Sequence, residues 1–115
     1  VQSIGNIATR DGNTNIYEPI AHAWMEMAKI ENLDDYLPAV ILMTDGESNN
    51  GSWEALENFW LKNNFAFEMP PVFSIRYGEA DPSQLNQLAE ETVGKVFDAK
   101  KQGLAAAFRS AGGYN

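Results

Sequence analysis

Residues 40–50 read VILMTDGESNN: four apolar side chains and a threonine, followed by an acidic, amide-rich loop that contains a glycine. A short apolar run that ends in turn residues is typical of a strand buried on both faces, as parallel sheets require. Asp45 then follows the carboxyl end of that strand, the edge where open α/β sheets bind their ligands. Asp-Gly is also a common turn dipeptide, because glycine tolerates positive φ and aspartate bonds its own backbone. The stretch alone leaves both interpretations of Asp45 open, a functional carboxylate and a turn residue.

Strands and helices are predicted to alternate along the chain. Residues 1–15 are polar and turn-rich, although Ile4 and Ile7 could end an upstream helix, and residues 32–38 are expected to form a loop. The predicted strands are 39–44, 70–77 and 95–97, and the predicted helices are 15–31, 52–63, 82–93 and 104–111. Alternation of this kind implies an α/β fold with parallel strands joined by right-handed crossovers. Three strands are few for such a sheet, so the chain is expected to form part of one.

Apolar spacing and capping residues define the helices. The first helix has an apolar stripe at Ile16, Ile20, Trp24 and Met27, and Asn15 and Glu18 have the spacing of a capping box before Pro19 in the first turn. Ser52 can cap the second helix, which places Trp53, Leu56 and Trp60 on one side. Asp81 and Pro82 fit the N-cap and first position of the third, whose stripe is Leu85, Leu88, Ala89 and Thr92 and which Gly94 ends. The stripe of the last helix is Leu104, Ala107, Phe108 and Ala111.

The composition is that of one modest globular domain. The chain has 115 residues, of which 44% are hydrophobic, and no repeats or linkers divide residues 1–115. A formal net charge of −8 argues against nucleic acid and anionic membrane surfaces as partners and favours cations or basic surfaces. The lack of cysteine excludes disulfides and thiolate metal sites. Because no apolar run approaches the roughly 20 residues of a membrane span and residues 1–30 have no leader pattern, nothing in this chain is expected to anchor or export it, and its compartment stays open.

Polar residues in three loops are candidates for a site at the carboxyl edge of the sheet. Thr14 precedes the first helix, Asp45 follows the first strand, and Glu79 and Asp81 follow the second. A hydroxyl and a carboxylate suit a hard divalent cation, although two protein ligands would hold it weakly. Thr14 also fits a hydroxyl that merely flanks a helix. No glycine-rich dinucleotide motif, P-loop or HExxH sequence is present.

The histidine and the tryptophans have simpler interpretations. His22 shares the polar face of its helix with Glu26 and Lys29, so a solvated side chain is expected, and it has no serine or cysteine partner pattern for a triad. The three tryptophans, Trp24, Trp53 and Trp60, have helical spacing with other apolar residues and are expected to pack in the core.

Three stretches resemble the second half of a von Willebrand factor type A domain: GNTNIYEPIAHAW (12–24), AVILMTDGESNNG (39–51) and VFSIRYGEADPSQLNQLAEETVGKVFDA (72–99). Their order and spacing carry the resemblance, which covers nearly the whole chain. The ending GKVFDAKKQGLAAAFRSAGGYN (94–115) is similar to that of poorly characterised bacterial proteins with this domain at their carboxyl terminus. The resemblance implies a three-layer α/β/α, Rossmann-like fold with a mainly parallel sheet, here lacking its first strands.

The resemblance also implies a metal-ion-dependent adhesion site that holds Mg²⁺ or Mn²⁺ in three loops. Thr14 matches the family's threonine, Asp45 matches the aspartate of its Thr-Asp-Gly sequence, and Gly46 and Glu47 lie in the supporting loop. The family's Asp-x-Ser-x-Ser motif is missing. The two stretches that come nearest to it, DGES (45–48) and DPS (81–83), do not have its spacing of aspartate and serines. The chain is therefore expected to be a fragment with two of five metal positions and no useful metal affinity of its own.

Three functions remain open at this point. The first is a binding module, not an enzyme, whose complete form grips a protein partner through the cation. The second is a structural or assembly role in which contacts at the sheet edge matter and metal does not, and the third and most remote is a phosphoaspartyl enzyme that uses Asp45, with Lys62 and Arg76 as basic groups. Because strand 39–44 would pair with a missing strand, its bare edge is expected to make the fragment a homodimer.

Overall fold

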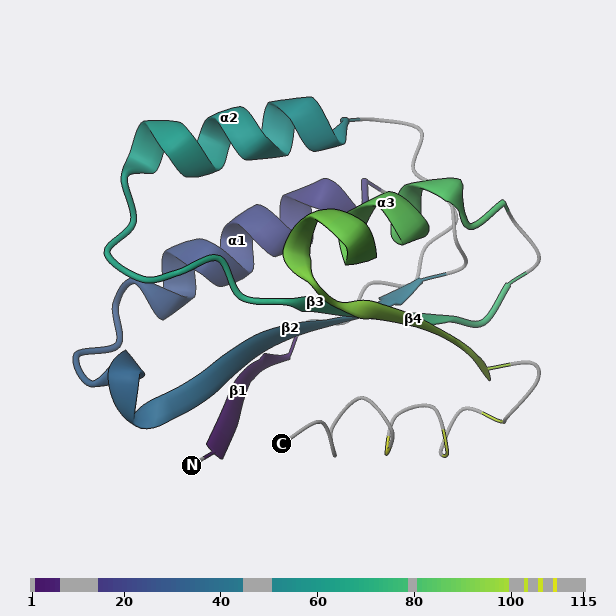
Figure 1. Ribbon diagram of the computed structural model, residues 1–115, viewed down its shortest axis with the longest axis horizontal. Helices are drawn as coiled ribbons and strands as arrows, with labels where there is room; N and C mark the ends of the chain where they lie inside the picture. The colour runs from purple at the N-terminus through teal and green to yellow at the C-terminus, as the bar shows by residue number, and fades with distance from the viewer. Residues whose placement is uncertain are drawn as a thin grey trace.

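The structure, a computed structural model, describes residues 2–6, 15–44, 51–78 and 81–99 and the single positions 103, 106 and 109. Strands and helices alternate along the described chain, as the sequence predicts, and Figure 1 shows the helices above a twisted sheet. The elements in order are β1 (Gln2–Asn6), α1 (Tyr17–Met27), the 3₁₀ helix η1 (Leu33–Asp35), β2 (Tyr36–Thr44), α2 (Trp53–Asn63), β3 (Val72–Arg76), α3 (Ser83–Thr92) and β4 (Lys95–Asp98).

The four strands form one parallel sheet in the order β1-β2-β3-β4. Because crossovers between parallel strands are right-handed, strands that follow one another in chain order place every crossover helix on the same face. Figure 1 shows α1, α2 and α3 together on that face. The prediction of an α/β fold with a parallel sheet is confirmed, and the helices on this face form one layer. The predicted last helix, 104–111, lies largely outside the described residues, so the predicted third layer stays a prediction.

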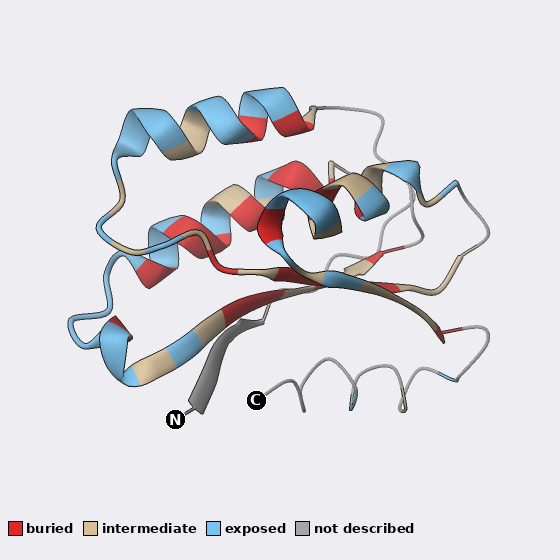
Figure 2. Ribbon diagram, in the orientation of Figure 1, coloured by how far each residue is buried: buried red, intermediate tan, exposed pale blue. Residues whose placement is uncertain are grey.

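Two apolar clusters occupy the two faces of the sheet. The larger one packs α1, α2 and α3 against the sheet and includes all four residues of the predicted α1 stripe, whose exposed fractions are at most 2%. Figure 2 shows these buried residues on the sides of the helices that face the sheet. Trp24 and Trp53 are buried there and the half-buried Trp60 packs against them, which confirms the predicted core role. The smaller cluster, on the opposite face, contains Ala39, Phe73, Ile75 and Ala99.

The three predicted capping side chains accept hydrogen bonds from backbone N–H groups, but only Ser52 is the N-cap residue of its helix, because the N-caps of α1 and α3 are Ile16 and Pro82. Asn15 Oδ1 accepts hydrogen bonds from the N–H groups of Tyr17 and Glu18, and Ser52 Oγ accepts one from Ala55 N–H. Asp81 Oδ1 accepts from Ser83 N–H at 2.9 Å, although the helix begins at Ser83, one residue after Pro82. The first helix, however, ends at Met27, before the predicted Glu31.

Two predictions for the amino-terminal part of the chain are wrong. Residues 2–6 form β1, a strand parallel to β2, and not a turn-rich segment or a helix end. Residues 32–38 are not a loop, because η1 occupies 33–35 and β2 begins at Tyr36. Pro38 is tolerated inside β2 because Val40 N–H already bonds to Pro71 O, before β3 begins. The nitrogen of Pro38 faces the same side of β2 as that of Val40, at a level where β3 has not yet begun. The N–H that proline lacks would therefore have no acceptor on β3.

The prediction that the edge of strand 39–44 has no partner strand is wrong for the first part of that strand. Asn6 of β1 pairs with Ile41, and the β1–β2 ladder runs from Tyr36 to Ile41. The sheet edge offered for homodimerisation is therefore occupied up to Ile41 by the chain itself.

The sequence predicts that Gly94 ends α3, but the helix ends at Thr92, and the residue that leaves it in the left-handed conformation is Val93. Val93 has that conformation, with φ of 59°, and its side chain is 85% exposed. Gly94 is needed for another reason, because a Cβ at this position would lie 1.9 Å from Val72 O. The chain enters β4 in direct backbone contact with β3.

Candidate functional site

The carboxyl ends of β2, β3 and β4 lie side by side at one edge of the sheet. Thr44, Arg76 and Asp98 are the last residues of the three strands, and the register pairs Thr44 with Arg76 and Arg76 with Asp98. Tyr77 N–H donates a hydrogen bond to Thr44 O at 3.1 Å, which extends the ladder one step beyond the strands. The prediction that strand 39–44 ends just before Asp45 is confirmed, so Asp45 follows a strand at the edge where such sheets bind ligands.

The predicted site residues themselves, Thr14, Asp45, Gly46 and Glu47, lie outside the described residues. Their neighbours Asn15 and Thr44 are described, and both belong to this end of the molecule. Thr44 is 1% exposed at the end of β2, and Asn15 caps the amino end of α1.

A direct approach joins the two segments that carry the predicted residues. Gly51, which precedes α2, has φ of 83°, and a Cβ on it would lie 3.0 Å from Asn15 Oδ1 and 3.1 Å from Tyr17 Cδ2. Only glycine fits this combination of left-handed backbone and close packing without strain. The segment before α1 and the segment between β2 and α2 therefore meet at Asn15 and Gly51.

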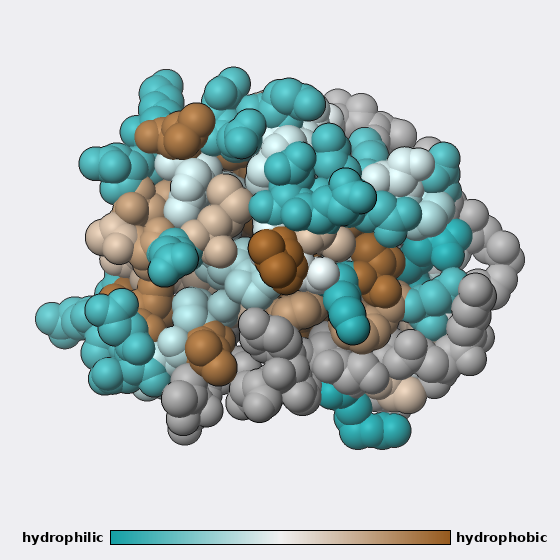
Figure 3. Space-filling model, viewed as in Figure 1, coloured by the Kyte–Doolittle hydropathy of each residue, from teal (hydrophilic) through white to brown (hydrophobic). Residues whose placement is uncertain are grey.

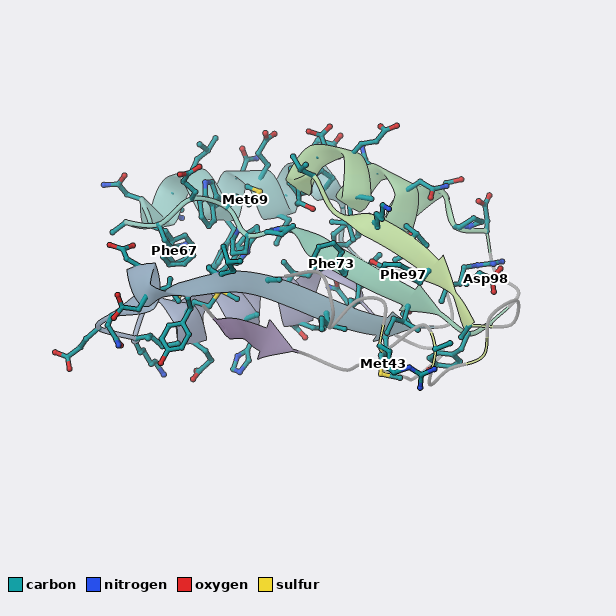
Figure 4. All side chains as sticks on the ribbon, turned by 60° about the horizontal axis from the view of Figure 1, so that its bottom comes forward. Met43, Phe67, Met69, Phe73, Phe97 and Asp98 are labelled. Carbon is teal, nitrogen blue, oxygen red and sulfur yellow. The ribbon has the colours of Figure 1, made fainter. Side chains whose placement is uncertain are left out.

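An ion pair lies across the ends of β3 and β4. Arg76 Nη1 donates to Asp98 Oδ2 at 3.2 Å, with side-chain exposed fractions of 16% and 27% (Figure 4 labels Asp98). This pair was not predicted, although Arg76 lies inside the predicted strand 70–77 and Asp98 directly follows the predicted strand 95–97. The missing step was the register, which brings the two residues directly opposite one another.

Near this edge, hydrogen bonds favour the ionised form of Asp81. The hydroxyl and the N–H of Ser83 hold the pKa of Asp81 below its usual value, and the positive charge of Arg76 acts in the same direction. Beside Gly51, burial and the nearby charge of Glu54 raise the pKa of the Tyr17 hydroxyl, so it stays protonated at neutral pH.

The basic residues named for a phosphoaspartyl enzyme are not brought together. Arg76 ends β3 at the carboxyl edge and is paired with Asp98. Lys62 lies in the last turn of α2, which runs back toward the amino ends of the strands (Figure 1). His22 is exposed on α1, as predicted. Within the described ranges no three histidine, cysteine or acidic residues are grouped so that they could hold a metal ion.

Comparisons with known proteins leave the family open. No protein-family description, curated protein or solved structure matches this chain. Among the described residues, no helix is both long and apolar enough to cross a bilayer.

Proposed function

We propose that this chain is part of a von Willebrand factor type A domain and that the complete domain binds a protein partner through Mg²⁺ or Mn²⁺. The observation that carries the proposal is the contact of Gly51 with Asn15, which joins the segments adjacent to Asp45 and Thr14. Both segments lie at the carboxyl edge of a parallel sheet, where loops from separate strands build ligand sites.

The donor chemistry of these loops suits such a cation. Thr14 would hold the ion directly or through water, and the Asp45 carboxylate would supply negative charge from the first or second layer around it. Gly46 would allow the loop to turn tightly, with Glu47 beside it. A bound cation would attract an acidic group of a partner to a protein whose net charge is −8.

The same proposal includes the three-layer architecture. Phe73 and Ile75 are 3% and 0% exposed on the face of the sheet that α1, α2 and α3 do not cover. A helix at 104–111, with its predicted apolar stripe, would account for this burial. No observation on the described residues favours the phosphoaspartyl enzyme, since Arg76 pairs with Asp98 and Lys62 lies in the last turn of α2.

Paramagnetic broadening by Mn²⁺ tests the proposal even where affinity is weak. With two of the five family positions, the chain is expected to bind Mn²⁺ only weakly, but the ion should visit the predicted site first. The amide signals of Asn15, Thr44 and Gly51 should then broaden at lower Mn²⁺ concentrations than that of Val72, which lies at the amino end of β3 on the opposite edge of the sheet.

A matched pair of variants separates the site from general attraction to an acidic protein. Asp45→Asn should abolish the preference for Asn15 and Gly51. Glu57→Gln neutralises a carboxylate in the same way at an exposed position in α2 and should leave the preference intact. Equal broadening over the whole surface, or a preference that survives Asp45→Asn, would contradict the metal site and favour the assembly role without metal.

A further inference from the structure

A cavity lies at the amino edge of the sheet, at the end of the molecule away from the site proposed above. It has a volume of about 460 Å³ and is lined by residues of the segment after α1 and of the segment after α2. Cavities between about 300 and 1,000 Å³ are the usual size of small-molecule sites. The cavity is therefore large enough for a small molecule.

The wall combines apolar and polar surface in nearly equal parts. Phe65 and Phe67 line it from the segment after α2, and Met25 and Ile30 line it from α1 and the residues that follow. Met25 is 42% exposed and Ile30 is 37% exposed, so their apolar atoms are open to a ligand. Figure 4 shows Phe67 on the connection from α2 to β3, and Figure 3 shows apolar side chains gathered on the same side of the molecule.

The charged part of the wall has one sign. Glu31 and Asp34 line the cavity, and no lysine, arginine or histidine is among its described lining residues. Carboxylates next to aromatic rings form a favourable environment for an organic cation, which is attracted both by the charges and by the faces of the rings. An anionic ligand would find no counter-charge among the described lining residues.

We propose that this cavity binds a small organic cation: an ammonium group that pairs with Glu31 and Asp34, on an aromatic or alkyl body that packs against Phe65 and Phe67. Complementarity of charge and of apolar surface selects this occupant over a lipid anion or a nucleotide. The inference does not depend on the proposed metal site, because none of the lining residues lies at the carboxyl edge.

The test is a titration followed by amide chemical shifts with three probes of the same shape: naphthylethylammonium, naphthylethanol and naphthylpropanoate. The ammonium should give saturable shifts at Ile30, Ala66 and Phe67, and the neutral alcohol should bind about tenfold more weakly, as expected for the loss of a charge-assisted contact. The carboxylate should bind more weakly still, because it is repelled by both acidic residues.

Two double variants control for the overall negative charge. Glu31→Gln with Asp34→Asn should weaken binding of the ammonium about tenfold, while Glu90→Gln with Glu91→Gln removes the same charge from the exposed end of α3 and should not. All four residues are exposed, so none of these changes threatens the fold. Equal binding of the alcohol and the ammonium would overturn the proposal, as would equal weakening by the two double variants. Concentration-dependent shifts at Ile30 and Phe67 without any probe would also overturn it, since a second copy of the chain would then cover the cavity.

Discussion

Replacing Gly94 by alanine should destabilise the protein severely, although the change adds one methyl group. The added Cβ would lie 1.9 Å from Val72 O and 2.7 Å from Val72 C, both backbone atoms that cannot rotate away. Restoring ordinary contact would require β3 and β4 to separate locally by roughly 1.5 Å. That displacement breaks backbone hydrogen bonds of normal length, because an N···O distance beyond about 3.5 Å is no longer a hydrogen bond.

The size of the destabilisation by Gly94→Ala follows from the hydrogen bonds next to Gly94. The first ladder pairs, Phe73 with Lys95 and Ser74 with Val96, lie directly beyond it, and Thr92 Oγ accepts a hydrogen bond from Val72 N–H at 2.9 Å. Losing or straining about three bonds at about 1 kcal/mol each lowers the free energy of unfolding by about 3 kcal/mol. For a domain of this size the melting temperature should fall by about 10 °C.

Val93→Gly is the matched control in the same turn, and it should raise the free energy of unfolding where Gly94→Ala lowers it. Val93 holds φ of 59° and is 85% exposed, so glycine relieves left-handed strain of about 1–2 kcal/mol and loses little packing. After the added flexibility of the unfolded chain is subtracted, a net gain of about 0.5–1 kcal/mol is expected. Both variants are measured by urea unfolding and thermal melts followed by circular dichroism. A Gly94→Ala protein within about 1 kcal/mol of the parent, or a Val93→Gly protein no more stable than it, would refute the reasoning.

Three smaller predictions follow from single side chains. Ser74→Ala should be neutral or stabilising by up to about 1 kcal/mol in urea unfolding, because the buried Ser74 Oγ has no hydrogen-bond partner among the described residues. Ser52→Ala should cost about 1 kcal/mol in the same assay, because it leaves the N–H of Ala55 at the start of α2 without its cap. The pKa of Asp81 is lower in the folded protein than in the unfolded chain, because Ser83 donates hydrogen bonds to its carboxylate. These bonds therefore stabilise the fold at pH values above the unfolded pKa, and the stabilisation is lost as the pH falls through the folded pKa. A carboxyl NMR titration of Asp81 should show the low pKa, and Ser83→Ala should raise it toward the usual value.

The sequence was most informative where local pattern and tertiary environment agree. Ile16, Ile20, Trp24 and Met27 repeat at helical spacing, and this spacing is sufficient to identify the buried side of α1. The strand at the start of residues 40–50 could be predicted because a sheet buried on both faces needs continuous apolar residues. Ser52 could be assigned as a cap because few residue types accept hydrogen bonds from the first turn of a helix.

It was least informative where pairing between distant residues decides the structure. Residues 2–6 have no strong strand pattern, and they form β1 through backbone pairing with residues 36–41. The ion pair of Arg76 with Asp98 depends on register, and the role of Gly94 depends on the approach of Val72, neither of which is encoded in neighbouring residues. For the same reason sequence spacing cannot place Thr14 beside Asp45.

The distance between Thr14 and Asp45 tests the central claim most directly. The contact of Gly51 with Asn15 leads us to expect that the loops on which they lie remain adjacent beyond these two residues. In a nuclear Overhauser spectrum of the metal-free protein, the methyl protons of Thr14 should show cross-peaks to the amide protons of Asp45 or Gly46. If Thr14 shows cross-peaks only to residues near it in the chain while Asn15 and Gly51 are in contact, the two candidate ligands do not share a site and the proposed metal site is contradicted.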